Sequence, residues 1–260
     1  MSAAFLWGWR DLRAHWTRPV SAPLPLWPLW LALGIAAFGS LTDVSVYFDV
    51  AEARDAAHLD PAILRFFEFI TRFGESGWLF AASILILAGA LVARQRASSA
   101  RQKAALGLLA SRAFYFFAVQ AVSGILSQVV KHLVGRARPK LLDTLGPHHF
   151  DFFSVKAVLA SFPSGHTTTM FAAAAALSFF TPRYWPALFG FALLVAASRL
   201  GLGSHYPSDV LGGAALGLAS AFAVARIFAR RKIAFTSEGE ELMPKPRGSG
   251  MIGEALGKRA

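Results

Sequence analysis

The chain lacks cysteine altogether and carries few charged residues for its length. None of its 260 residues is a cysteine, which excludes a disulfide framework and any metal site built on thiolates. Only 16% of the residues are charged and 55% are hydrophobic, whereas an ordinary soluble domain has roughly 25% charged residues. This balance argues against a water-soluble globule and favours a helical membrane protein with several spans.

Carboxylates are scarcer than cations. The chain has 15 Asp and Glu residues against 26 Lys and Arg residues, which gives a formal net charge of +11. A basic chain often binds nucleic acid. Here, however, the basic residues separate apolar runs and do not cover a polar fold. We interpret them as signals of membrane topology and expect no nucleic-acid partner.

Six apolar segments have lengths near that needed to cross a bilayer. They are residues 26–48, 78–93, 113–134, 162–180, 184–197 and 210–229. The predicted fold is therefore an all-α integral membrane six-helix bundle with its core at residues 26–232. Residues 1–25 are expected to form a cytoplasmic or interfacial segment, and the polar residues 233–260 a disordered cytoplasmic tail. Gly213 and Gly217, with alanine neighbours, predict close helix packing.

The charges of the short loops predict the orientation. Basic residues lie at or after the ends of the second, fourth and sixth segments, at Arg94, Arg96, Arg101, Lys103, Arg183, Arg226, Arg230, Arg231 and Lys232. The positive-inside rule places that side in the cytoplasm. Residues 47–77 then lie on the opposite side, where their many Asp and Glu residues indicate an acidic outer loop. This opposite side is therefore the non-cytoplasmic side.

Three polar clusters interrupt the apolar pattern, each at the edge of a long apolar segment. They consist of Lys131 with Arg138-Pro139, of Pro163-Ser164-Gly165-His166, and of Ser198-Arg199 with His205 and Asp209. Charged groups near hydrocarbon are costly and are usually functional. In the predicted topology all three clusters lie at the non-cytoplasmic membrane edge, where they can form one active site.

The cations of these clusters point to an anionic ligand. Lys131, Arg138 and Arg199 would lie on the cytoplasmic side if they only anchored helices, and the predicted topology places them opposite. Arginine forks suit phosphate oxygens. Ser164 and Gly165 predict the N-terminus of a helix, where free backbone N–H groups also attract an anion.

The histidines supply groups for acid–base and nucleophilic chemistry. His205 and Asp209 are four residues apart, so a carboxylate can fix the tautomer of the imidazole and leave its other nitrogen as a nucleophile. His166 can then protonate a leaving oxygen. Metal ligation by these three residues is the rival interpretation. Because the neighbouring cations would repel a divalent ion, we expect no metal and no cofactor.

The three clusters, in this order and spacing, resemble the signature of the type-2 phosphatidic acid phosphatase superfamily. The likeness covers residues 131–209, with every key position present, and the six-span layout extends it. It implies that His205 attacks phosphorus to form a phosphohistidine, that Asp209 orients His205, and that His166 is the general acid. The residues that it implies for binding the phosphoryl oxygens are Lys131, Arg138, Ser164, Gly165 and Arg199.

The expected function is that of a metal-independent membrane phosphatase acting on a phosphorylated lipid of the bilayer. The likeness of the six-span core to bacterial members of the superfamily implies a bacterial inner membrane, with the site facing the periplasm. The resemblance allows undecaprenyl pyrophosphate, phosphatidylglycerophosphate, phosphatidic acid or lipid A as substrate, as a phosphate or a diphosphate ester. Vanadate-dependent haloperoxidases have a similar anion pocket, but they are soluble. A catalytically silent lipid-phosphate binding protein or transporter is the other alternative, and the intact histidines argue against it.

Overall fold

The computed structural model describes residues 46–236 and 244–248. These residues are mostly helical and divide into two compact units. The first, here called the paired-helix unit, holds Gly77–Val119 and the described part of 222–260. The second, the site unit, holds the described part of 27–76 and Gln120–Ala221. The predicted N-terminal segment and most of the first apolar segment lie outside the described residues.

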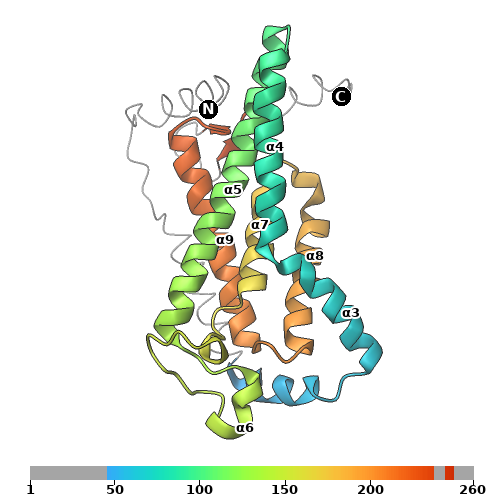
Figure 1. Ribbon diagram of the computed structural model, residues 1–260, viewed down its shortest axis with the longest axis vertical. Coiled ribbons are helices and arrows are strands. Elements are labelled where there is room, and N and C mark those ends of the chain that lie inside the picture. Colours follow the sequence, from blue (N-terminus) through green and yellow to red (C-terminus); the bar gives the residue numbers. More distant parts are fainter. Residues whose placement is uncertain (1–45, 237–243, 249–260) are drawn as a thin grey trace. The chain divides into compact units, whose positions relative to one another are not determined.

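Four helical stretches of the described chain are long and apolar enough to cross a bilayer. They are α4 (Ser76–Arg96), α5 (Ala100–Val134), the stretch Pro182–Gly201, which contains η4 (Pro182–Tyr184) and α8 (Trp185–Gly201), and α9 (Pro207–Arg230) (Figure 1). They coincide with four of the predicted segments. The expectation of a largely helical membrane fold is confirmed for this part of the chain.

Helix α7 (Gly165–Ser178) coincides with the fourth predicted segment but is shorter than a full span. Its 14 residues measure about 21 Å along the axis, against about 30 Å for the hydrocarbon core of a bilayer. The number of six spans therefore stays a prediction.

Aromatic contacts hold the paired-helix unit together. The rings of Phe80 and Phe117 meet edge to face with centroids 5.3 Å apart, which joins α4 to α5. Tyr115 is fully buried, and its ring packs against Phe228 and Phe235. Such pairs stabilise beyond the area that they bury.

Part of the stretch predicted as a disordered tail is ordered. Strand β1 (Phe235–Thr236) pairs antiparallel with β2 (Lys245–Pro246), and the side chain of Phe235 is fully buried. Residues 237–243 and 249–260 lie outside the described residues.

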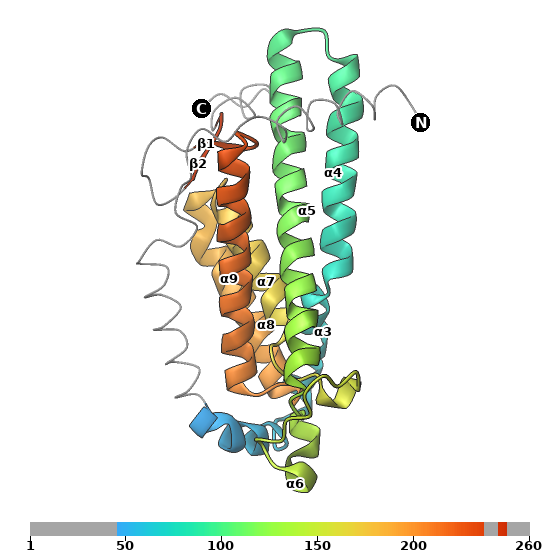
Figure 2. The same cartoon turned by 90° about the vertical axis from the view of Figure 1, so that its left-hand side faces the viewer.

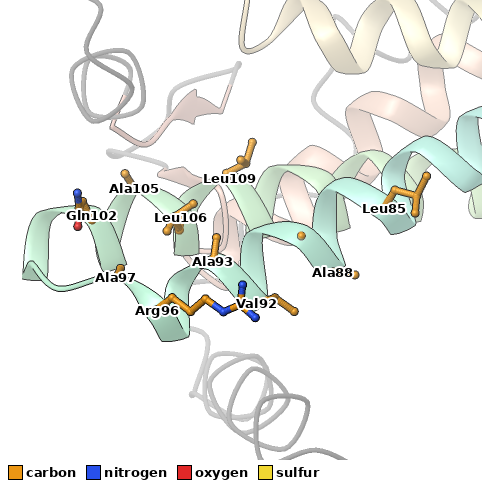
Figure 3. Close-up of a pocket in the computed structure, with 11 residues that line it drawn as sticks. Leu85, Ala88, Val92, Ala93, Arg96, Ala97, Gln102, Ala105, Leu106 and Leu109 are labelled. Carbon is orange, nitrogen blue, oxygen red and sulfur yellow. The ribbon is translucent and has the colours of Figure 1, made fainter.

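An apolar groove runs between α4 and α5 near the turn that joins them (Figure 3). Leu85, Val92 and Leu106 are among the aliphatic side chains that line it, and Arg96 and Gln102 line it close to the turn. Aliphatic surface with polar groups confined to the helix ends is typical of helices that face lipid.

Residues 46–76 of the site unit, which were predicted as an acidic outer loop, are largely helical, and their place on the outer side stays a prediction. Residues 46–56 are helical, and α3 (Pro61–Thr71) and η1 (Arg72–Gly74) follow. Helix α3 begins where Asp60 Oδ1 accepts a hydrogen bond of 2.6 Å from the backbone N–H of Ala62, as an N-cap residue does. The amphipathic α3 packs on α8.

Helix α8 lies between α3 and α7 and forms the apolar core of the site unit with them. Ile70, Phe171 and Val195 contribute to this core from α3, α7 and α8. Gly201 allows α3 to approach closely, because a Cβ atom there would lie 2.3 Å from the ring of Phe67.

Helices α7 and α9 approach each other through glycine, as predicted from Gly213 and Gly217. A Cβ atom at Gly213 would lie 2.6 Å from the carbonyl oxygen of Ser164, and one at Gly217 would lie 2.5 Å from that of Thr168. The approach of the two helices also brings the backbone N–H of Ser164 within 2.9 Å of the carbonyl oxygen of Asp209. Two of the predicted clusters therefore meet through main-chain atoms.

A long connection from α5 to α7 completes the site unit (Figure 2). It contains η2 (Pro139–Leu141), α6 (Leu142–Leu145) and η3 (Ala157–Leu159). Its first residues, Gly135–Arg138, are held against its last ones by backbone hydrogen bonds, including Ser161 N–H to the Arg136 carbonyl at 3.1 Å.

Candidate functional site

The predicted site residues lie in the site unit, where four helix ends meet. These are the C-terminal ends of α5 and α8 and the N-terminal ends of α7 and α9 (Figures 1 and 2). Lys131 at the end of α5 bonds to the carbonyl of Pro163 just before α7. The electrostatic neighbours of His166 include Arg199, His205, Lys131 and Arg138. The fold thus brings residues of all three sequence clusters together.

Three cations of the site bond only to neutral groups among the described residues. Lys131 Nζ, which is buried, donates to the carbonyls of Ala160 at 3.0 Å and Pro163 at 2.6 Å. Arg138 Nε donates to a carbonyl at 3.0 Å, and Arg199 donates to the hydroxyl of Thr71 at 2.6 Å.

No ion pair joins these three cations to a carboxylate in the described part of the chain. A desolvated charge is unfavourable until a counter-charge completes its surroundings. The arrangement therefore fits a polyanionic group such as a phosphate.

The start of α7 supplies further donors. Ser164 is the N-cap residue, as predicted, but its side chain does not cap the helix. Instead its Oγ accepts a hydrogen bond of 3.0 Å from Thr167 Oγ1, so its own O–H can donate to a ligand. A Cβ atom at Gly165 would meet only ordinary contacts, the nearest being Lys131 Cε at 3.7 Å. The missing side chain leaves room beside Lys131 at a helix N-terminus, where anions bind well.

His205 is buried in the turn between α8 and α9, close to Asp209. Its Nδ1 lies 3.6 Å from Asp209 Oδ2, which is longer than a hydrogen bond. Burial lowers the pKa of His205 to about 4, although the nearby carboxylate of Asp209 opposes the change. The imidazole is therefore neutral near pH 7, as a nucleophile must be.

His166 is half-buried on the first turn of α7, against η1. A Cβ atom at Gly74 would lie 2.6 Å from its Cδ2 atom. The absence of a side chain at Gly74 thus makes the space that the imidazole occupies. Gly74 belongs to the stretch that was predicted as an outer loop.

Asp209 is fully buried and accepts three strong hydrogen bonds. Arg136 donates to its Oδ1 at 2.7 Å, whereas the hydroxyl of Ser161 at 2.6 Å and the backbone N–H of Tyr206 at 2.9 Å donate to its Oδ2. The carboxylate is therefore fixed in place by groups other than His205. Neither Arg136 nor Ser161 was among the predicted site residues.

Arg136 links Asp209 to a second buried carboxylate. Its other terminal nitrogen donates to Asp49 Oδ2 at 2.8 Å. Ser208 donates to Asp49 twice, from its backbone N–H at 3.0 Å and from its hydroxyl at 2.6 Å. The guanidinium also lies 4.4 Å from the centre of the Tyr206 ring.

Asp49 belongs to the stretch that was predicted as an acidic outer loop, and its side chain is fully buried. The only signal for this network in the sequence is an extra arginine two positions before Arg138. Spacing cannot identify a partner 87 positions away.

Comparison with known proteins places these features in a family. A model of the PAP2 superfamily matches residues 112–233, which include all three clusters. A lipid A 1-phosphatase of Rhizobium johnstonii is 33% identical over 228 residues, covering 87% of this chain and 91% of that protein. A lipid A 1-phosphatase of Rhizobium etli is 35% identical over 180 residues, covering 69% of this chain and 78% of that protein.

Two proteins of Bacillus subtilis extend the comparison. An undecaprenyl-diphosphatase is 37% identical over 99 residues, covering 35% of this chain and 47% of that protein. The crystal structure of a transmembrane PAP2-type phosphatidylglycerolphosphate phosphatase matches with a TM-score of 0.50 and 23% identity, covering 74% of this chain and 94% of that chain. This structural likeness concerns the fold alone.

The family model spans the helix ends that form the site, and the Rhizobium johnstonii relative aligns with most of the chain. The protein therefore belongs to the PAP2 superfamily and is a membrane phosphatase, a hydrolase of phosphate esters.

Proposed function

We propose that this protein removes a phosphate group from a membrane lipid through a phosphohistidine at His205, with the 1-phosphate of lipid A as the first candidate substrate. The observation that carries the proposal is the set of buried or half-buried cations, Lys131, Arg138 and Arg199, whose described partners are all neutral. Lys131 and Arg138 are electrostatic neighbours of His205, and Arg199 is a neighbour of His166. The choice of lipid A is supported by the two Rhizobium relatives, which cover most of this chain.

The position of Asp209 supports Nε2 of His205 as the attacking nitrogen. Nδ1 of His205 faces Asp209, so Nε2 is the nitrogen directed to phosphorus. As the N–P bond forms, the bond from phosphorus to the lipid oxygen breaks. That oxygen takes a proton from His166, which carries the proton once the phosphate dianion is bound beside it and offsets the neighbouring cations. Water then attacks the phosphohistidine, giving its proton to His166 and releasing phosphate and neutral His205.

The cations and the start of α7 stabilise the transition state. Negative charge spreads over the phosphoryl oxygens as the bond to the leaving oxygen weakens. Lys131, Arg138 and Arg199, with the Ser164 hydroxyl and the first N–H groups of α7, hold these oxygens. Preorganised donors of this kind need no rearrangement during the reaction.

We also propose that the site faces the periplasm from the inner membrane of a bacterium. Support comes from α5, whose first turns carry Arg101 and Lys103 and whose last turn carries Lys131. The helix is 35 residues long, about 52 Å, so its two ends cannot lie at the same membrane surface. The positive-inside rule assigns its start to the cytoplasm.

Phosphate release from a panel of purified lipids in mixed micelles tests the proposal. The panel holds lipid A, undecaprenyl pyrophosphate, phosphatidylglycerophosphate and phosphatidic acid, and we expect the highest kcat/KM with lipid A. His205→Ala should abolish release while the protein still elutes as a folded species in detergent. Activity should persist in EDTA. Full activity of His205→Ala would exclude the nucleophile assignment.

A trapping experiment separates catalysis from simple lipid-phosphate binding. Wild-type protein quenched in alkali during turnover of labelled lipid should retain a base-stable, acid-labile label, and His205→Ala should not. Tight lipid binding without phosphate release by the wild type would support the silent binding protein or transporter instead.

A further inference from the structure

The connection from α5 to α7 exposes an unusual set of large apolar side chains beside the site. Phe152, Phe153 and Val155 have 65%, 76% and 83% of their surface exposed. Phe150 and Val158 are also exposed, and the rings of Phe150 and Phe152 stack with centroids 6.3 Å apart. We call residues 150–158 the apolar loop. Contiguous apolar surface of this kind marks a binding surface, because water does not favour it.

The backbone of the apolar loop holds its aromatic tip in an unfavourable conformation. Phe153 has a φ of 62°, in the left-handed region that bulky residues rarely adopt. This backbone conformation costs free energy, and burial of the ring does not offset the cost while the ring is exposed to water. A nonaqueous environment for the ring would recover part of this cost.

The exposed surface continues onto the membrane-facing side of α5. The last turns of this helix carry exposed aliphatic side chains at helical spacing, namely Val122, Ile125, Leu126, Val129 and Leu133. The apolar loop is attached at the end of this stripe. Phe153 N–H donates to the carbonyl of Leu133 at 3.4 Å, and His132 Nδ1 lies 2.9 Å from the carbonyl of Ser154.

We propose that the apolar loop inserts into the outer leaflet of the membrane, as an extension of the lipid-facing surface of α5. The occupant of this surface is the bilayer itself. Phe, Leu and Val side chains are those that enter the interfacial region. Lys156, exposed between Val155 and Ala157, is placed to meet lipid phosphates at the same level.

Insertion of the loop also sets the depth of the phosphate-binding segment. Hydrogen bonds join the loop to residues 135–138: Asp151 N–H to the Gly135 carbonyl at 2.9 Å, Ala137 N–H to the His149 carbonyl at 3.0 Å and Arg138 N–H to the Val158 carbonyl at 3.0 Å. Because Arg138 belongs to this segment, the loop and the cation move as one body. If the proposed function holds, the inserted loop keeps the cations at the level of a lipid phosphate.

Depth measurements on single spin labels test the insertion without reference to activity. The chain has no cysteine, so Phe152→Cys and Val155→Cys each provide one labelling site. Ile125→Cys on the lipid-facing stripe serves as the lipid reference, and Asp143→Cys on α6, exposed in the same connection, serves as the aqueous reference. Each variant is reconstituted in vesicles of phosphatidylcholine and phosphatidylglycerol, and power saturation is compared with oxygen and with a water-soluble nickel chelate.

Labels at 152 and 155 should behave like the label at 125, accessible to oxygen and protected from nickel. Nickel accessibility equal to that at 143 would overturn the proposal. Protection from both probes would overturn it as well, because the surface would then be covered by protein.

A comparison of activities tests whether insertion of the apolar loop places the cations at the depth of the lipid phosphate. Phe152→Ser with Val155→Ser should lower kcat/KM several-fold for lipid in vesicles and leave it unchanged for a short-chain, water-soluble phosphatidic acid. The matched variant Phe152→Leu with Val155→Ile should behave as wild type with both. Equal loss with both substrates would show damage to the site and would contradict the depth role. A wild type that is inactive with every substrate would contradict the proposed function and leave the spin-label result standing.

Discussion

Arg136 and Arg138 are two residues apart, yet the fold gives them different partners. Arg136 lies between two fully buried carboxylates, Asp49 and Asp209. Arg138 bonds to main-chain carbonyls of the following connection. The first guanidinium is therefore part of the scaffold that positions Asp209, whereas the second keeps its charge available for a ligand.

Arg136→Ala and Arg138→Ala should separate these two roles. Loss of Arg136 leaves two buried carboxylates without their cation, which costs about 3–5 kcal/mol. We expect a large fall of the thermal midpoint in detergent. Loss of Arg138 should lower kcat on the order of 100-fold, as removal of one transition-state donor does, with little change of the midpoint. Equal midpoints for the two variants would contradict the scaffold role of Arg136.

The buried His205 should make stability depend on pH. Its pKa is about 4 in the folded protein and about 6.5 in an unfolded chain. Between these two pH values the unfolded chain binds a proton that the folded protein does not. The free energy of unfolding is therefore unaffected by His205 above pH 6.5 and decreases as the pH falls toward 4.

The decrease in the free energy of unfolding approaches roughly 3 kcal/mol near pH 4. Thermal midpoints of the wild type and of His205→Gln, measured from pH 8 to pH 4.5, check this expectation. As the pH falls, the thermal midpoint of the wild type should decrease more than that of His205→Gln. Parallel curves would show that His205 titrates normally.

At the scale of the elements, the contact of α7 with α9 determines the geometry of the site. Gly213 and Gly217 let the two backbones approach, and the N–H of Ser164 then reaches the carbonyl of Asp209. Main-chain atoms thus hold the start of α7 against the start of α9. The side chains depend on this approach for their own positions.

Gly217→Ala should therefore impair both folding and activity. The added Cβ atom would lie 2.5 Å from the Thr168 carbonyl and 2.8 Å from the Ala172 nitrogen, and neither backbone atom can move aside alone. Gly190→Ala on α8 is the matched control, since its Cβ atom would meet nothing within 4 Å. We expect a lower thermal midpoint and lower kcat/KM for the first variant. The control should be unchanged or slightly more stable, because alanine favours helix. Equal behaviour of both variants would contradict the role of the contact.

For the whole molecule, sidedness decides which leaflet supplies the substrate. Ser98 lies exposed between α4 and α5, and Asp143 lies exposed after α5. Helix α5, which lies between these positions in the chain, has 35 residues, about 52 Å of helix and more than the thickness of a bilayer core. The predicted topology assigns Ser98 and the C-terminus to the cytoplasm and Asp143 to the periplasm.

Labelling of single cysteines in cells measures this arrangement directly. Asp143→Cys should react with a membrane-impermeant maleimide in intact spheroplasts. Ser98→Cys and Ala260→Cys should react only after permeabilisation. Reaction of Asp143→Cys and Ala260→Cys from the same side would contradict six spans.

Much of the helical architecture was predictable because hydropathy is a local property. Five of the six apolar segments correspond to helices in the described chain, and Ser164 is the N-cap residue that its sequence context indicated. The helices of residues 46–76 were missed because this stretch is too polar and too short to read as a span. Their packing on α8 stabilises them instead.

The sequence by itself determined the helical membrane class, the three clusters and the chemistry that their residue types permit. Only the tertiary structure decided which charges are paired. Asp209 meets Arg136 and Ser161 because four helix ends converge. Lys131, Arg138 and Arg199 bond to neutral groups instead. Electrostatic energy depends on distance and burial, and neither quantity is encoded in spacing along the chain. The same reason explains why His205 and Asp209, four residues apart, stand 3.6 Å apart without a hydrogen bond.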